Sequence, residues 1–141
     1  MVVLDTNMMS VLEWRDTPKA NTILDRLDRY PAKEIATTII TYEEQVRGWL
    51  SFIHQHQDTL VKQIHGYRML NRQLDNYRWI HVLDFDEIAA IEFQSLKKQH
   101  RRFPTMDLKI AAIVKTKSAT LVSENLRHFT PIAGLTVENW L

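Results

Sequence analysis

The sequence predicts an α/β domain built on a short, mostly parallel sheet of about four to five strands. Short apolar runs recur along the chain, and the segments between them show helical periodicity. The chain has 141 residues, of which 45% are hydrophobic. This is enough for one well-buried core and too little for a second domain to be expected. We therefore expect a single domain over residues 1–141.

The expected strands are short, as in a small sheet that is covered by helices. Each is separated from the next by a segment long enough for a helical crossover, which favours parallel pairing. The strands are expected at Val2 to Leu4, Ile35 to Ile39, Ile80 to Leu83, Thr120 to Val122 and, with a weaker pattern, Leu135 to Val137.

Three helix starts carry recognisable capping residues. Thr17 stands before Pro18, which favours a helix that begins at the proline. Thr41 and Glu44 have the spacing of a capping box and predict the start of a second helix. Thr105 is the expected cap of a third helix, which contains a long apolar run.

The segment from Gln55 to Arg78 is long and polar and contains histidine, and its apolar residues have helical spacing. We expect an amphipathic helix here. Its apolar face is expected to pack in the core rather than to form a surface for self-association or for a protein partner. The residues of this face are Leu60, Val61, Ile64, Tyr67, Leu70 and Leu74.

Composition excludes several kinds of chemistry. The chain has no cysteine, which excludes disulfides, thiolate zinc sites and a cysteine nucleophile. A metal would therefore need oxygen or imidazole ligands. No apolar stretch approaches the roughly 20 residues that cross a bilayer, and the first residues lack the pattern of a signal peptide. We expect a soluble protein of the cytoplasm with no membrane partner.

The net charge is only +1, from 18 basic and 17 acidic side chains, so the charge of the whole molecule will not hold a polyanion. The densest basic patch runs from Lys97 to Arg102. Cations near the negative end of a helix explain this patch as well as a phosphate-binding track does.

Four oxygen-bearing residues lie beside predicted strand or helix ends: Asp5, Glu44, Asp107 and Asn125. Taken singly, three of them have structural roles that need no metal. Glu44 fits the capping box, Asp107 gains from the dipole of its helix, and Asn125 fits a turn. Asp5 is harder to explain, because a carboxylate directly after a buried strand is costly to desolvate unless it caps the next helix or binds a cation.

The joint placement of the four residues points to a metal site. In a doubly wound sheet, residues that follow strands and residues that open helices can face the same edge. Carboxylates gathered there repel each other unless a divalent cation neutralises them. Because the ligands are hard oxygen atoms, we expect Mg²⁺ or Mn²⁺.

Four sequence blocks together identify a resemblance. They are Asp5-Thr6-Asn7, Ile40 to Glu44 with Gly48 following, Met106 to Ala112, and Leu121 to Phe129. In order and spacing they resemble the PIN-domain family, and more closely the VapC-type toxins of prokaryotic toxin–antitoxin pairs. The resemblance runs along the whole chain and is weakest between residues 55 and 78.

The resemblance implies a three-layer α/β/α sandwich and a metal-dependent endoribonuclease that hydrolyses phosphodiester bonds in RNA. Asp5, Glu44 and Asp107 match the acidic positions of the family, and Asn125 matches a fourth position that is often aspartate. Ser123 matches the small hydroxyl residue of the last motif. On this basis Asp5 and Asp107 would hold the metal directly, and Glu44 and Asn125 would hold it through water. Ser123 would position a ligand or a phosphate oxygen.

The resemblance also implies partners. We expect an RNA substrate, such as a single-stranded loop of tRNA or rRNA, a small antitoxin protein, and a homodimer. His128 is expected to be a structural or RNA-contacting residue rather than a catalytic one. The candidate phosphate contacts are Arg101, Arg102, Lys109 and Arg127.

Two alternatives stay open at the level of sequence. The first is a degenerate PIN module that binds RNA or a protein without cleavage, which Asn125 in place of an acid would allow. The second is an aspartyl-phosphate enzyme, either a receiver domain or a phosphatase, with Asp5 as the nucleophile. Such nucleophiles usually have a second aspartate close by, whereas here Thr6 and Asn7 follow, so the nuclease is preferred.

Overall fold

A computed structural model describes all residues from 1 to 141 and shows five strands in one sheet. The strands lie in the order β3-β2-β1-β4-β5, and every neighbouring pair is parallel. The predicted parallel α/β sheet is therefore confirmed, although the ends of β2, β3 and β5 differ by one residue from those expected. The strands are β1 Val2–Leu4, β2 Ile35–Thr38, β3 His81–Leu83, β4 Thr120–Val122 and β5 Thr136–Glu138.

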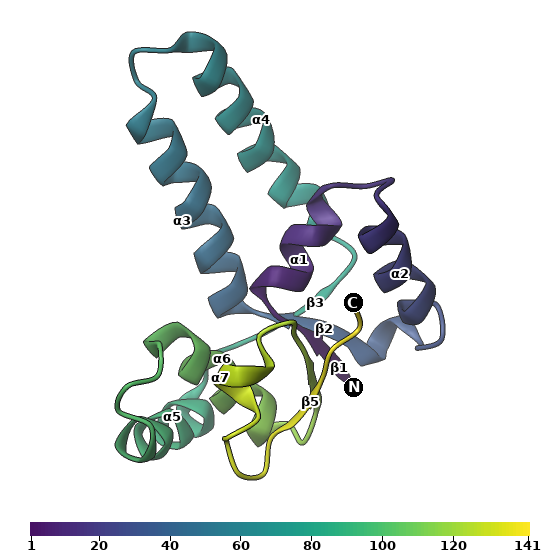
Figure 1. Cartoon of the computed structure of the whole chain (residues 1–141), viewed down its shortest axis with the longest axis vertical. Coiled ribbons are helices and arrows are strands. Elements are labelled where there is room, and N and C mark those ends of the chain that lie inside the picture. Colours follow the sequence, from purple (N-terminus) through teal and green to yellow (C-terminus); the bar gives the residue numbers. More distant parts are fainter.

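Seven α-helices and one 3₁₀ turn connect the strands (Figure 1). The helices are α1 Thr6–Glu13, α2 Pro18–Leu27, α3 Ile39–Gln55, α4 Leu60–Asn76, α5 Glu87–Gln99, α6 Thr105–Thr116 and α7 Leu126–Phe129, and the 3₁₀ turn is Ala32–Glu34. In Figure 1, α3 and α4 form an antiparallel hairpin that projects away from the sheet. None of the helices combines the length and the apolar character that crossing a membrane requires.

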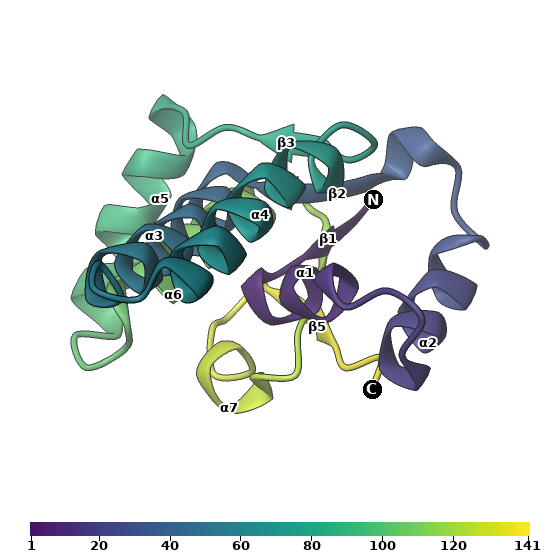
Figure 2. The same ribbon diagram turned by 90° about the horizontal axis from the view of Figure 1, so that it is seen from above.

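The core lies on both faces of the sheet because side chains alternate along each strand. Val3 belongs to a cluster of 16 buried residues that includes two residues of α5 and six of α6. Val2 and Leu4 point the other way, into a cluster of 12 buried residues with α1 and α2. Figure 2 shows these two helix pairs on opposite sides of the sheet. The result is the expected three-layer sandwich.

The predicted cap of α2 is confirmed, but that of α3 is wrong. Thr17 accepts a hydrogen bond from the Ala20 amide at 3.2 Å and begins α2. In α3 the capping residue is Thr38, whose hydroxyl accepts from the Thr41 amide at 3.1 Å. β2 runs into α3 without a loop, so no polar segment marks where the helix begins. Thr41 therefore lies inside the helix rather than at its start.

The predicted cap of α6 is also wrong. Pro104 occupies the capping position, and no side chain bonds to the free amides there. Thr105 is the first helical residue instead. Asp107 still lies in the first turn, so its carboxylate gains from the helix dipole as expected.

The helix predicted after residue 55 exists as α4, but the prediction that its apolar face packs in the core is wrong. The buried stripe of α4 contains Gly66, Met69, Gln73 and Asn76. Gly66 determines this orientation, since a Cβ atom there would lie only 2.6 Å from Ile53 Cγ1 of α3. The expected core residues Leu60, Val61, Ile64, Tyr67 and Leu74 are each more than half exposed, and only Leu70 of that set is half-buried.

The strand order fixes where a ligand can bind. From central β1 the chain crosses first to β2 and β3 on one side and later to β4 and β5 on the other. A crevice forms where the order reverses, outside the carboxyl ends of β1 and β4. Asp5 directly follows β1, and Ser123 directly follows β4.

Candidate metal centre

Asp5 is a buried carboxyl at the start of α1. Its Oδ1 accepts from the Met8 amide at 2.9 Å, so it caps the helix, and the residue is only 4% exposed. Burial raises the pKa of Asp5 to about 6. Hydrogen bonds from Ser123 and Met8 lower that pKa, and the negative charge of Asp107 raises it further. The hydrogen bond of the cap offsets only part of the cost of burying the charged carboxylate, because the pKa stays raised.

Asp107 enters the crevice from the first turn of α6 and is half-buried. Its charge raises the pKa of both Asp5 and Glu44, although burial is the larger cause for each of the two. The structure therefore brings the carboxyls of three distant segments within electrostatic reach of one another. No lysine or arginine forms an ion pair with any of the three.

Glu44 lies in the second turn of α3 and is held by a neighbouring hydroxyl. Thr6 Oγ1 donates to Glu44 Oε1 at 2.6 Å and lies 3.4 Å from Thr41 Oγ1. Burial raises the pKa of Glu44, and the bond from Thr6 lowers it. The expected capping-box role of Glu44 is therefore wrong, because its carboxylate points to α1.

The neighbouring Glu43 has a different role. It forms an exposed ion pair with Arg47, one helical turn further along α3. Its carboxylate is thus directed along the helix surface. This geometry supports Glu44, rather than Glu43, as the acid of the crevice.

Ser123 and Asn125 line the crevice from the end of β4. Ser123 is fully buried, and its Oγ accepts from the Asn125 amide at 2.9 Å. The Asn125 side-chain amide lies 2.6 Å from His128 Nδ1, and the same nitrogen lies 2.8 Å from Asp107 Oδ2. If His128 Nδ1 carries a proton, it donates to Asp107 and cannot accept from the NH₂ group of Asn125. Asn125 must then present its carbonyl oxygen to His128.

Two residues of this site were not among the predicted ones. Thr6 positions Glu44, and the signal was a hydroxyl directly after Asp5. His128 contacts Asp107 and was expected only as a structural or RNA-contacting residue. The signal in that case was its place three residues after Asn125, which is helical spacing.

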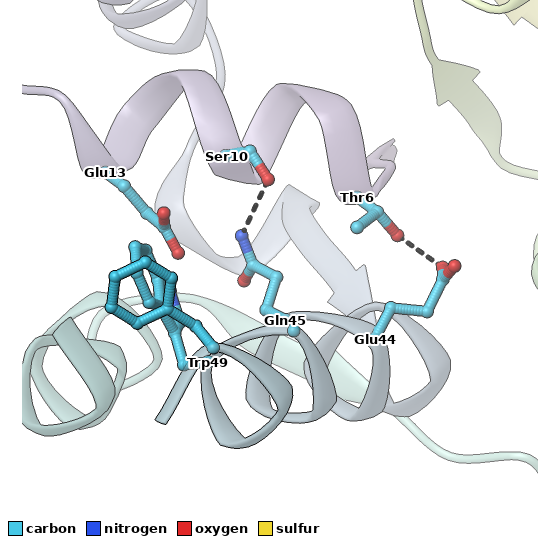
Figure 3. A pocket seen from close by; sticks show the side chains of 8 residues that line it. Thr6, Ser10, Glu13, Glu44, Gln45 and Trp49 are labelled. Atoms are coloured by element: carbon cyan, nitrogen blue, oxygen red, sulfur yellow. Dashed lines mark hydrogen bonds between the residues drawn. The ribbon is translucent and has the colours of Figure 1, made fainter. Parts of the chain in front are cut away.

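A cleft of about 290 Å³ extends from the crevice between α1 and α3 (Figure 3). Thr6 and Glu44 lie at one end of it, and Glu13 and Trp49 lie at the other. Midway, Gln45 donates to Ser10 at 3.3 Å and accepts from the Tyr77 hydroxyl at 2.5 Å. Fixed polar groups therefore line a cleft that begins at Glu44.

The donor chemistry fits a hard divalent cation. As the side chains stand, no three histidine, aspartate or glutamate residues are gathered closely enough to ligate one ion. Asp107 instead bonds to His128, and Glu44 bonds to Thr6. A divalent ion held by Asp5, Glu44 and Asp107 would replace these contacts. It would also favour the charged forms of Asp5 and Glu44, whose pKa values are raised by burial and, to a smaller extent, by the charge of Asp107.

The chain is similar to curated proteins named ribonucleases. Ribonuclease VapC2 of Haemophilus influenzae is 34% identical over 64 residues, which cover 43% of this chain and 48% of that protein. This match thus spans about half the length of the relative. Ribonuclease VapC1 of the same species is 27% identical over 143 residues, which cover 98% of this chain and 96% of the relative.

Solved structures share the fold along the whole chain. VapBC2 from Rickettsia felis bound to a promoter DNA fragment has a TM-score of 0.74 at 23% identity, covering 100% of both chains. VapBC-1 from nontypeable Haemophilus influenzae has a TM-score of 0.72 at 23% identity, covering 99% of this chain and 98% of that one. The model of the PIN domain family matches residues 2–135. The chain therefore belongs to the PIN domain family.

Proposed function

We propose that this chain is a VapC-type endoribonuclease, the toxin of a toxin–antitoxin pair, and that it hydrolyses phosphodiester bonds in RNA with Mg²⁺ or Mn²⁺. The observation that carries the proposal is the placement of Asp5, Glu44 and Asp107 around one sheet edge. They lie near enough that the charge of Asp107 adds to burial in raising the pKa of the other two. The match to relatives named ribonuclease supports it.

In this proposal Asp5 and Asp107 hold the ion directly, and Glu44 and Asn125 hold it through water. When bound, such an ion lowers the pKa of a water molecule and stabilises the charge that develops on the phosphate oxygens. The protein supplies the positioning of these ligands. The Met8 amide caps Asp5, Ser123 lowers the pKa of Asp5, and Thr6 fixes Glu44 through a hydrogen bond.

His128 is proposed to hold Asp107 rather than to transfer a proton. Its Nδ1 lies 2.8 Å from Asp107 Oδ2, so the ring restricts the rotation of a carboxylate on the outer side of the crevice. The side chain of Asn125 contacts the same nitrogen. The amide at the fourth ligand position is thus part of a fixed arrangement.

The substrate is proposed to be a single-stranded RNA loop, such as one of a tRNA or rRNA, which places the protein in the cytoplasm. A small antitoxin partner is supported by the solved VapBC toxin–antitoxin complexes that share the fold. A homodimer is supported by exposed apolar side chains on α5, where Ile88 is 67% and Ile91 is 69% exposed. Apolar surface of this kind favours burial against a protein.

One alternative retains support from a specific observation. Asn125 replaces an acid and, with Asp107, contacts His128, which would suit a PIN module that binds RNA or a protein without cleavage. Metal binding without turnover would favour this alternative. The match of the PIN domain model over residues 2–135 contradicts a receiver domain or a phosphatase.

Cleavage of structured RNA by the purified protein tests the proposal, with Mn²⁺, Mg²⁺ or EDTA present. We expect cuts that require a divalent ion and that are lost in Asp5→Asn and Asp107→Asn. The control is Asp25→Asn, which removes an exposed carboxylate of α2 and should leave cleavage unchanged. A folded wild-type protein that binds the ion but cuts no RNA in a broad panel would replace the nuclease by the binding module.

A further inference from the structure

We propose that single-stranded RNA enters the site over the corner between α5 and α6, with unpaired bases stacked on aromatic rings and phosphates held by arginines. We call residues 97–103 the entry corner. The inference rests on the proposed function, because it assigns a binding surface to the RNA substrate.

Three rings lead from the entry corner to the metal centre. The rings of His100 and Phe103 are stacked, with centres 4.7 Å apart and an angle of 29° between their planes. Phe103 and His128 follow at 6.4 Å and 36°. His128 in turn lies 2.8 Å from Asp107. All three rings are half-buried, so this row of partly exposed aromatic residues ends at a candidate metal ligand.

The same corner carries unpaired positive charge. Four exposed cations lie within six residues, and none of them forms an ion pair. Three of them line an open hollow of about 510 Å³ together with Gln94. Since the net charge of the chain is only +1, this positive potential is local. The four cations are Lys97, Lys98, Arg101 and Arg102.

The ends of the helices explain only part of this surface. Lys97 and Lys98 lie in the last turn of α5, where the helix dipole favours cations. Arg101 and Arg102 lie beyond the capping residue His100, outside the range of that effect. Core packing accounts for one edge of Phe103, which contacts the larger buried cluster, but it does not account for the exposed arginines beside it.

Aromatic rings interleaved with cations are the combination that binds single-stranded nucleic acid. Bases in a duplex already stack on each other and have no free face for a protein ring, so the proposal is limited to unpaired RNA. An acidic protein partner would use the arginines but would gain little from rings that lead to Asp107. The row of rings therefore favours RNA over a protein at this corner.

The test measures binding of a fluorescently labelled single-stranded RNA oligonucleotide by anisotropy in EDTA, which prevents metal-dependent cleavage. His100→Ala and Phe103→Leu remove a ring, and the leucine keeps apolar contact with the core. The double variant Arg101→Gln/Arg102→Gln removes two cations. The matched control is Arg29→Gln/Lys33→Gln, which removes two exposed cations that form no ion pair elsewhere on the surface.

We expect each ring variant to weaken binding by about tenfold, within the range for the loss of a stacked base. The double arginine variant should weaken binding and reduce the slope of log affinity against log salt by about 0.7 per arginine. The control variant should change the affinity and the salt dependence far less. The wild-type protein should bind the same RNA sequence more weakly when it is in a duplex. Thermal unfolding verifies that each variant remains folded, and His100→Ala tests the rings independently of the core.

Binding to the corner variants that equals binding to the control, no RNA binding by the wild type, or equal affinity for duplex and single strand would each overturn the proposal. The proposal would also be overturned if the corner variants kept their affinity for RNA but lost affinity for an acidic peptide, since the corner would then bind a protein partner. Parallel cleavage with Mn²⁺ separates the two proposals. If the corner variants lose RNA binding but neither they nor the wild type cleave RNA, the entry corner is supported and the nuclease is refuted. If the corner variants cleave RNA with the kcat/KM of the wild type, the nuclease is supported and the entry corner is refuted.

Discussion

Asp5 shows how one residue can serve the fold and the site in opposite ways. Its carboxylate caps α1 through the Met8 amide, which stabilises the helix. Its burial raises its pKa to about 6, which means that the charged form is held at a cost. Asp5 has no cation partner in the chain, so a bound divalent ion would reduce the cost of keeping its carboxylate charged.

This cost predicts a dependence of folding stability on pH. Between the ordinary pKa of 3.8 and the folded value of about 6, folded Asp5 binds a proton that the unfolded chain has lost. Stability of the metal-free protein should therefore fall as the pH rises through this window, by about 3 kcal/mol from Asp5 alone, of which about 2 kcal/mol is lost between pH 4.5 and pH 7.5. Denaturant unfolding in EDTA at pH 4.5 and pH 7.5 measures it. Asp5→Asn keeps a cap, should be more stable than wild type at pH 7.5, and should lose the part of the pH dependence that Asp5 contributes.

A flat stability profile in wild-type protein, or one that Asp5→Asn leaves unchanged, would show that Asp5 is not held at a cost.

Thr6 is a second residue whose role is local and testable. It donates to Glu44 at 2.6 Å, and this bond stabilises the charged carboxylate. Thr6→Val removes the donor at nearly constant volume, so the pKa of Glu44 should rise and the affinity for Mn²⁺ should fall by on the order of tenfold. Thr6→Ser retains the hydroxyl and should restore both. Calorimetric titration with Mn²⁺ compares the three proteins, and equal affinity in all of them would remove Thr6 from the site.

At the scale of elements, the α3–α4 hairpin depends on one glycine. A Cβ at Gly66 would meet Ile53 Cγ1 at 2.6 Å and Phe52 Cδ1 at 3.1 Å, whereas a Cβ at Gly48 meets nothing within 4 Å. Gly66→Ala should therefore lower the free energy of unfolding by about 1–3 kcal/mol through overpacking. Gly48→Ala, in the middle of α3, should raise it by about 0.5–1 kcal/mol. Denaturant titration of both variants measures these changes, and an equal gain from both would contradict the close packing.

The elements differ in how much of them the sequence reveals. The strands were predictable because a short apolar run between two helical segments is typical of a buried parallel strand. The cap of α3 was not, since β2 passes directly into the helix and Thr38 and Thr41 both fit the capping position. The buried stripe of α4 was not predictable from apolar residues either, because Gly66 and polar residues face α3. Sequence patterns also missed α1, whose 8 residues are too few to show a clear period.

At the scale of the whole molecule, the parallel sheet explains why the site could be located from the sequence. Residues that follow parallel strands share one edge, so Asp5 and Ser123 were expected together although they are far apart in the chain. The contact between His128 and Asp107 was not predictable, because it depends on how α7 packs against α6. Side-chain contacts of this kind depend on how helices and strands pack against one another. The sequence pattern of a single segment does not reveal that packing.

Calorimetric titration of the metal-free protein with Mn²⁺ at pH 6 and pH 8 shows whether these acids form a metal site. We predict about one site per chain that is lost in Asp5→Asn and Asp107→Asn and retained in Asp25→Asn. Binding at pH 6 should release more protons than at pH 8, because the carboxyls with raised pKa values must ionise to bind. Undiminished binding in the two site variants, or no binding by folded wild-type protein, would contradict a metal site formed by these acids.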